Sequence, residues 1–275
     1  SGVLIVFRDE VAVRDVVAET VNPETPSDVE VSRPSDALEA RAAADEALVF
    51  MLPYRAELFA QVPVAHLAVS ATFWQSVAPL PPDVVGTPLT YDVVGTVEQA
   101  LRWRPEADRL VVVTGTSPWD MEWEARMRAH VAGLPEQLSV EFMAGLPADA
   151  LQRRLRDLPA NSIVFTPGFF RDGSGREFVP REASQLVAVA SSVPVYGPFS
   201  TFMGTGIVGG RMASYDAIGR LAAETTIELL DGASPASLTP PAAMPTPLQV
   251  DWRQLQRWGI SPRAVPVDAI VLFKP

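Results

Sequence analysis

The chain of 275 residues has no cysteine, a single lysine and two histidines. Without cysteine it can form no disulfide bridge, thiol nucleophile or cysteine-ligated metal site. Neither His66 nor His130 belongs to an H-E-x-x-H helix, and no G-x-S-x-G elbow is present. We expect His66 to be a buried structural residue and His130 to end a helix. We therefore predict no catalytic residue, no metal site, no cofactor and no enzymatic activity for this chain.

Long apolar runs are also missing. The longest, such as VLIVF at 3–7, are far too short to cross a bilayer. The chain begins with Ser-Gly and not with Met, so we expect a segment from which a signal peptide or membrane anchor has been removed. The net charge of −11 predicts repulsion from nucleic acid and from anionic membrane surfaces. Hydrophobic residues make up 48%, which is enough for a globular core.

Short apolar runs alternate with amphipathic segments along most of the chain. This alternation is typical of parallel sheets covered by helices on both faces. The expected strands are 3–7, 28–32, 47–52, 64–70, 109–115, 138–144, 161–167, 193–199 and 206–210. The expected helices include 35–46, 94–105, 119–134, 147–158, 180–192 and 214–231.

A segment rich in proline and glycine, residues 75–92, interrupts this rhythm and is predicted to cross between two lobes. The sequence therefore predicts an α/β fold of two Rossmann-like lobes with parallel sheets and a cleft between them. We expect the crossings at 85–92 and 206–213 to act as a hinge that closes on a ligand.

The segment GTGIVG at 204–209 matches the G-x-G-x-x-G pattern of dinucleotide sites. That pattern requires a helix that opens on the third glycine, whereas the next expected helix starts at Ser214. A glycine-rich strand with a close backbone approach is the better interpretation.

Residues that follow the expected strands are the candidate binding residues, because open α/β sheets bind ligands beyond the carboxyl ends of their strands. Aromatic walls with a few fixed polar groups suit a small-molecule pocket. The predicted ligand-binding residues are Arg8, Asp9, Tyr54, Arg55, Thr116, Ser117, Phe169, Phe170, Tyr196 and Phe199. They suggest a small organic ligand with a flat apolar part, and the arginines allow a carboxylate.

Four stretches carry a resemblance to a known family: YDVVGTVEQALRW…RLVVVTGTSPWDMEWEARMR, FFRDGSGREFVPRE, VPVYGPFSTFMGTGIVGG and VDWRQLQRWGI…VPVDAIVLFKP. Together, over roughly residues 90–275, they resemble the periplasmic-binding-protein-like sensor region of bacterial membrane histidine kinases. That region is related to the ABC-transporter substrate-binding proteins.

The resemblance implies a type I periplasmic-binding-protein fold, with residues 1–89 and 214–250 in the first lobe and 90–213 in the second. It implies that 251–275 form a C-terminal segment leading to a membrane anchor. It also implies an extracytoplasmic sensor on the periplasmic or extracellular face of the inner membrane, with membrane contact through segments outside this chain and a possible homodimer.

Two functions stay open, a ligand-binding sensor domain of a transmembrane histidine kinase and a solute-binding protein of an ABC importer. A hydrophobic span of about twenty residues after residue 275 would favour the sensor. The last helix, DWRQLQRWGI at 251–260, is expected to start at Asp251 and to pack Trp252, Leu255 and Trp258 on the body of the protein.

Overall fold

The computed structural model describes residues 4–6, 48, 52–53 and 62–275. The chain divides into two compact units. Unit 1 comprises Ser1–Thr90 and Asp216–Met244, and unit 2 comprises Tyr91–Tyr215 and Pro245–Pro275. The chain therefore passes from one unit to the other three times.

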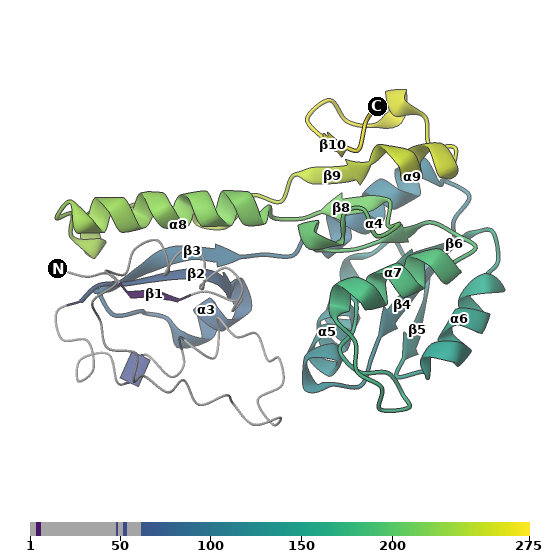
Figure 1. Cartoon of the computed structure of the whole chain (residues 1–275), viewed down its shortest axis with the longest axis horizontal. Helices are drawn as coiled ribbons and strands as arrows, with labels where there is room; N and C mark the ends of the chain where they lie inside the picture. Colours follow the sequence, from purple (N-terminus) through teal and green to yellow (C-terminus); the bar gives the residue numbers. More distant parts are fainter. Residues whose placement is uncertain (1–3, 7–47, 49–51, 54–61) are drawn as a thin grey trace, which may run out of the picture. The chain divides into compact units, whose positions relative to one another are not determined.

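Unit 1 is built on a parallel sheet with the strand order β1-β2-β3 in the described residues (Figure 1). Its strands are β1 (Leu4–Val6), β2 (Val64–Ser70) and β3 (Val84–Leu89), and its helices include α3 (Ala71–Val77) and α8 (Tyr215–Leu230). On one side Val64 and Val84 pack with Leu48. On the other side Leu229 of α8 packs on Ala65 and Val85, which holds the long helix to the sheet.

Helix α8 ends at Leu230, one residue before its predicted end. Gly232 has a φ of 98°, the left-handed conformation that glycine adopts without strain. The Gly232 N–H donates to the Leu229 carbonyl and the Ala233 N–H donates to the Glu228 carbonyl. These two bonds form a Schellman motif, which satisfies carbonyls at the helix end.

Unit 2 is built on a seven-stranded sheet with the order β10-β9-β8-β7-β6-β4-β5. All neighbouring strands run parallel except β8 and β9, which are antiparallel. The strands are β4 (Arg109–Thr114), β5 (Ser139–Ala144), β6 (Ser162–Phe165), β7 (Val195–Tyr196), β8 (Gly209–Arg211), β9 (Leu248–Asp251) and β10 (Ile270–Leu272). The helices include α4 (Val93–Trp103), α5 (Pro118–His130), α6 (Ala148–Arg156), α7 (Pro180–Ala190) and α9 (Trp252–Arg257).

Two helix pairs accompany the parallel strands of unit 2. Helix α6 packs against α7, and α4 packs against α5. Figure 1 shows α6 and α7 on the near side of the strands. The central strands are almost entirely apolar and buried, as a sheet covered on both faces requires. The predicted α/β fold with parallel sheets is therefore confirmed.

The C-terminal boundaries differ from the prediction. Residues 214–250 were predicted in the first lobe and 251–275 as a separate segment, whereas Pro245–Pro275 belong to unit 2. The reason is strand pairing: β9 pairs with β8, and β10 pairs with β9. Both strands are short, so their patterns were not recognised as strands.

The predicted crossing at 75–92 includes the passage between the units at 90–91, but half of the range is regular structure. It contains part of α3 and the whole of β3, whose six residues are all buried. Gly86 is needed because the Cβ of any other residue would lie 2.2 Å from the His66 carbonyl oxygen. Pro88 is compatible with β3 because β3 is an edge strand of the described sheet.

Three residues of the hinge predicted at 206–213 form β8. The chain returns to unit 1 after this range, at 215–216, and passes back to unit 2 at 244–245. Of the segment GTGIVG at 204–209, only Gly209 belongs to a strand, β8. The predicted close backbone approach is found there, since a Cβ on Gly209 would lie 2.0 Å from the Gln249 carbonyl oxygen of β9.

One predicted strand in unit 1 is contradicted. Leu48, Leu52 and Pro53 are helical, whereas 47–52 was predicted to be a strand. A short apolar run cannot be distinguished from a buried helix by periodicity alone. The predicted elements at 28–32 and 35–46 lie outside the described residues.

Candidate functional site

The order of the strands in unit 2 creates a switch point between β4 and β6. The chain leaves β4 through α5 to reach β5 on one side, and it leaves β6 through α7 to reach β7 on the other. In open α/β sheets ligands bind beyond the carboxyl ends of the strands at such a point. The segments that follow β4 and β6 are residues 115–117 and 166–179.

These two segments are tied to each other. The Thr116 N–H donates to the Arg171 carbonyl at 2.8 Å, and the Thr116 hydroxyl donates to the Asp172 carbonyl at 2.9 Å. Ser117 caps α5 in a reciprocal capping box with Asp120, which closes the start of the helix. The backbone at the switch point is therefore fixed by the protein's own hydrogen bonds.

Asp120 fastens the second segment to α5. Its carboxylate is fully buried and accepts hydrogen bonds from the backbone N–H groups of Ser117 and Phe170, both at 2.9 Å, and from Arg171 at 3.2 Å. Burial raises the pKa of Asp120, against the lowering effect of these hydrogen bonds. The carboxylate acts as a structural acceptor that sets the position of Phe170.

Asp172 fastens the far end of the same segment. One carboxylate oxygen accepts from the Ala148 N–H at the start of α6 at 2.8 Å, and the other accepts from the backbone and hydroxyl of Ser174 and from the Arg176 N–H. Burial acts to raise the pKa of Asp172, but the hydrogen bonds outweigh it and hold the pKa below its usual value. Two buried carboxylates therefore fix the backbone of residues 170–176.

Aromatic side chains gather around this fixed backbone. The centre of the Trp119 ring lies 5.0 Å from that of Phe170, in an edge-to-face arrangement, and 6.2 Å from that of Phe199. The Tyr91 ring lies 4.8 Å from Trp123 and 5.6 Å from Phe199. We call this set the aromatic cluster; its members are Tyr91, Trp119, Trp123, Phe170 and Phe199. Tyr91 and Phe170 are partly exposed, whereas the other three rings are buried beneath them.

One cation lies at the edge of the aromatic cluster. The guanidinium carbon of Arg126 is 5.0 Å from the centre of the Tyr91 ring and 5.1 Å from that of Trp123. Arg126 also pairs with Glu122 of the same helix at 3.6 Å. The cluster thus combines flat apolar surface with one positive charge.

The predicted site residues separate into three groups. The structure brings Thr116, Ser117, Phe170 and Phe199 together at the carboxyl ends of the unit 2 strands. Phe169 and Tyr196 differ, since they are 1% and 2% exposed and belong to the hydrophobic core. The other four, Arg8, Asp9, Tyr54 and Arg55, lie outside the described residues.

Phe169 and Tyr196 are directed into the core by the packing of their neighbours. Phe169 packs edge-to-face on Phe178, and the Tyr196 ring stacks on Trp103 of α4. Burial raises the pKa of Tyr196. Phe169 follows β6 as predicted, whereas Tyr196 is the last residue of β7 itself.

Comparisons with known proteins bear on the fold. No family model matches the chain, and no curated protein matches it. Solved structures do match. A ligand-free, open substrate-binding protein with adhesive properties from Clostridium difficile is 16% identical with a TM-score of 0.61, covering 85% of this chain and 76% of that one.

Two further structures match to a similar extent. A conserved domain protein from Vibrio cholerae is 19% identical, with a TM-score of 0.56, over 84% of this chain and 75% of that chain. An ABC domain from Streptococcus pneumonia, solved in complex with L-Trp, is 15% identical, with a TM-score of 0.56, over 84% and 76%. The chain has the type I periplasmic-binding-protein fold.

Within this periplasmic-binding-protein fold, sequence reasoning missed several members of the site. Tyr91, Trp119, Trp123 and Asp120 were not among the predicted residues. A signal was present in SPWDMEW at 117–123, where a Ser-x-x-Asp capping box contains the first of two tryptophans four residues apart on one helix face. Both tryptophans lie on α5, the helix that follows β4.

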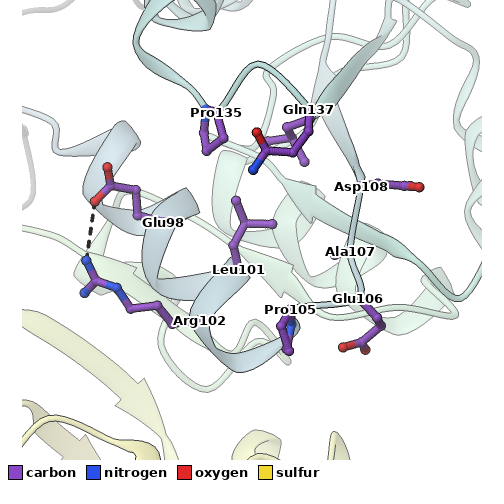
Figure 2. Close-up of a pocket in the computed structure, with 10 residues that line it drawn as sticks. Glu98, Leu101, Arg102, Pro105, Glu106, Ala107, Asp108, Pro135 and Gln137 are labelled. Carbon is purple, nitrogen blue, oxygen red and sulfur yellow. Dashed lines mark ion pairs between the residues drawn. The ribbon is translucent and has the colours of Figure 1, made fainter.

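A surface hollow of about 510 Å³ lies at the amino ends of β4 and β5 in unit 2, away from the carboxyl ends where the aromatic cluster lies. Figure 2 shows Leu101 of α4 pointing toward Pro135 and Gln137, with the Glu98–Arg102 ion pair at one side. Glu106 pairs with Arg104, and Asp108 accepts from Asn161. Its acidic groups are thus already engaged, and it lies at the end of the strands where such sheets do not place ligands.

The described residues offer no site for a metal ion, since no three His, Asp or Glu side chains among them converge. Among the residues that the structure describes, no helix is both long and apolar enough to cross a bilayer.

Proposed function

We propose that this chain is an extracytoplasmic solute-binding protein, which binds a small organic ligand without transforming it. The observation that carries the proposal is the aromatic cluster at the switch point of unit 2. The comparisons support it, because the C. difficile neighbour is a substrate-binding protein and the S. pneumonia neighbour was solved with L-Trp.

The aromatic cluster suits a ligand with a flat apolar part. Phe170 and Tyr91 are partly exposed, and the buried rings beneath them supply a rigid apolar floor. Because two carboxylates fix the backbone around Phe170, little conformational entropy is lost when a ligand packs on it.

Arg126 makes a carboxylate the favoured polar group of the ligand. Its guanidinium lies over two rings of the cluster, and its ion pair with Glu122 is long, at 3.6 Å. A ligand carboxylate that replaces Glu122 would form a charge-assisted hydrogen bond next to the apolar surface. The proposed class is therefore an aromatic carboxylate, an aromatic amino acid included.

A thermal-shift titration with L-tryptophan and a panel of aromatic and aliphatic carboxylates tests this proposal. A ligand at a hundred times its Kd should add about 2.7 kcal/mol to the free energy of unfolding. We expect aromatic carboxylates to raise the Tm and aliphatic ones of equal charge to have a smaller effect.

Two matched variants locate the site. Phe170→Ala should weaken binding about tenfold, since an aromatic pair contributes about 0.5–1.5 kcal/mol beyond its buried area. Phe142→Ala removes a similarly half-buried ring from β5, beneath Arg128, and should leave the Kd unchanged. No thermal shift with any compound of the panel, or equal losses in both variants, would contradict the proposal.

The sensor region of a membrane histidine kinase is the second candidate function. It is favoured by the four sequence stretches within residues 90–275 that resemble such regions. An immunoblot of native cells separates the two candidates. A free solute-binding protein should be too small to contain a kinase domain beside this 29.7 kDa region, whereas a sensor kinase should be large enough to contain one.

A further inference from the structure

The charge of the C-terminal part of the chain is opposite in sign to that of the rest. The chain has 22 basic and 33 acidic side chains. Residues 245–275 contain four of the basic and two of the acidic side chains, so the net charge of this segment is +2. The other 18 basic and 31 acidic side chains give residues 1–244 a net charge of −13. The net charge of the whole chain predicts repulsion from anionic surfaces, but residues 245–275 are positively charged and are not subject to that repulsion.

The basic side chains of this segment lie over aromatic rings. The guanidinium carbon of Arg253 is 4.0 Å from the centre of the Phe273 ring, and Lys274 Nζ is 5.3 Å from that of Trp252. A third pair is close by on the same helix, where the Arg257 guanidinium carbon is 4.7 Å from the Trp258 ring. We call this the basic aromatic surface; it comprises Trp252, Arg253, Arg257, Trp258, Phe273 and Lys274.

These residues belong to one structural block. Asp251 is the N-cap of α9 and pairs in register with Leu272 of β10, so the helix start and the end of the strand are neighbours. The Asp251 carboxylate is fully buried and is bonded by the Arg253 guanidinium at 2.7 Å. Among the described residues, no carboxylate lies within ion-pair distance of Arg257 or Lys274. Their charges are free to act on a partner.

Apolar side chains are exposed in the same block. Phe273 is 46% exposed, Ile270 is 41% exposed and Val267 is fully exposed. These are three of the eight large hydrophobic side chains that are exposed in the described part of the chain, and they fall within seven residues. Exposed apolar groups concentrated in this way mark an interaction surface.

We propose that the basic aromatic surface binds an anionic phospholipid bilayer. Aromatic rings with arginine and lysine beside them are the side chains that favour the interface between lipid headgroups and water. Lipid phosphates pair with the free cations while Phe273 and its apolar neighbours enter the headgroup layer. The remaining negative charge of the chain acts weakly there, because salt screens charges beyond about 10 Å.

The test is flotation of the 275-residue chain with vesicles at about 0.1 M salt, at which the charges of the rest of the chain are screened. One set contains phosphatidylcholine with about one third phosphatidylglycerol, and the other contains phosphatidylcholine alone. We expect binding to the first set only, with loss of binding when the salt concentration is raised.

Charge-matched variants then separate a local surface from overall charge. The double variant Arg257→Gln, Lys274→Gln should weaken vesicle binding about 25-fold, roughly fivefold for each cation near the surface. The control, Arg153→Gln with Arg156→Gln, removes two exposed cations from α6 and gives the same net charge. It should bind like the original chain.

An apolar pair of variants completes the design. Phe273→Ser should weaken binding to the anionic vesicles at about 0.1 M salt, whereas Val189→Ser, which alters a more exposed apolar residue on α7, should not. No binding to the anionic vesicles, equal binding to both vesicle sets, or an equal loss in the α6 control would overturn the proposal.

Discussion

At the scale of single residues, His66 is the most unusual polar side chain in the described part of unit 1. It is fully buried in β2, its ring lies 4.5 Å from that of Trp74, and neither ring nitrogen has a hydrogen-bond partner among the described residues. Burial lowers the pKa of His66 to about 4. The folded protein therefore holds this histidine neutral, as its place inside an apolar run predicted.

This burial makes the stability of unit 1 depend on pH. The unfolded chain binds a proton at His66 near pH 6.5 and the folded chain only near pH 4, so stability is complete above pH 6.5 and falls as the pH drops toward 4. Between pH 7 and pH 5 the loss should be about 2 kcal/mol. Urea unfolding at both pH values measures it.

His66→Gln is the control for that measurement. It should remove most of the pH dependence, whatever it does to the stability at pH 7. A small slope of the same sign should remain, because burial also lowers the pKa of His130. An unchanged slope in the variant would show that His66 is not the group that titrates.

At the scale of elements, α9 answers why two tryptophans stand near the end of the sequence. Asp251 caps the helix through the Arg253 N–H at 2.9 Å, as predicted. Leu255 is fully buried, while Trp252 and Trp258 are half-buried and pack against the core of unit 2. The prediction that these rings pack on the body of the protein is confirmed.

The buried face of α9 should contribute substantially to the stability of unit 2. Leu255→Ala should lower the free energy of unfolding by about 2–5 kcal/mol, and Trp252→Ala should cost less because its ring is half exposed. Gln256 is the exposed neighbour of Leu255 and supplies a control. Gln256→Ala should change the free energy of unfolding by no more than about 0.5 kcal/mol. Urea unfolding followed by circular dichroism measures all three, and ligand affinity should stay the same. A Leu255→Ala variant as stable as Gln256→Ala would show that α9 is only loosely attached.

At the scale of the whole molecule, the sheet of unit 2 is completed by Pro245–Pro275, which follow the second segment of unit 1 in the sequence. β9 supplies four buried residues beside β8, and it joins the sheet only after the chain has passed through α8. Unit 2 therefore cannot complete its sheet until the last segment of the chain has been made.

A truncation tests this dependence. Removal of Pro245–Pro275 should lower the stability of unit 2 by at least about 5 kcal/mol, because several side chains as buried as Val250 and Leu255 are lost. Removal of Phe273–Pro275 alone, which are exposed, should leave the unfolding midpoint nearly unchanged. Equal midpoints for both truncated chains would mean that β9 and α9 do not stabilise the sheet.

The sequence by itself determined the elements in which apolar residues are continuous or regularly spaced, or in which a capping residue marks the end of a helix. Strand β2, the central strands β4 and β6, and helices α7 and α8 lie within about two residues of their predicted bounds. The strands are mostly apolar and the helices are long, and α8 is followed by Gly232, which adopts the left-handed conformation of a helix end. The same local signals placed Thr116 and Phe170 at the carboxyl ends of strands.

Only the tertiary structure decided where the short strands pair and which way each side chain points. Strands β9 and β10 have four and three residues, too few for a period, and they exist because β8 offers a free edge. Phe169 and Phe170 are adjacent in sequence, yet one enters the core and the other faces outward. That difference depends on hydrogen bonds that the backbone N–H groups of Phe170 and Arg171 donate to Asp120, fifty residues away in sequence. Contacts between residues so far apart form only when the chain has folded, and no local pattern in the sequence records them.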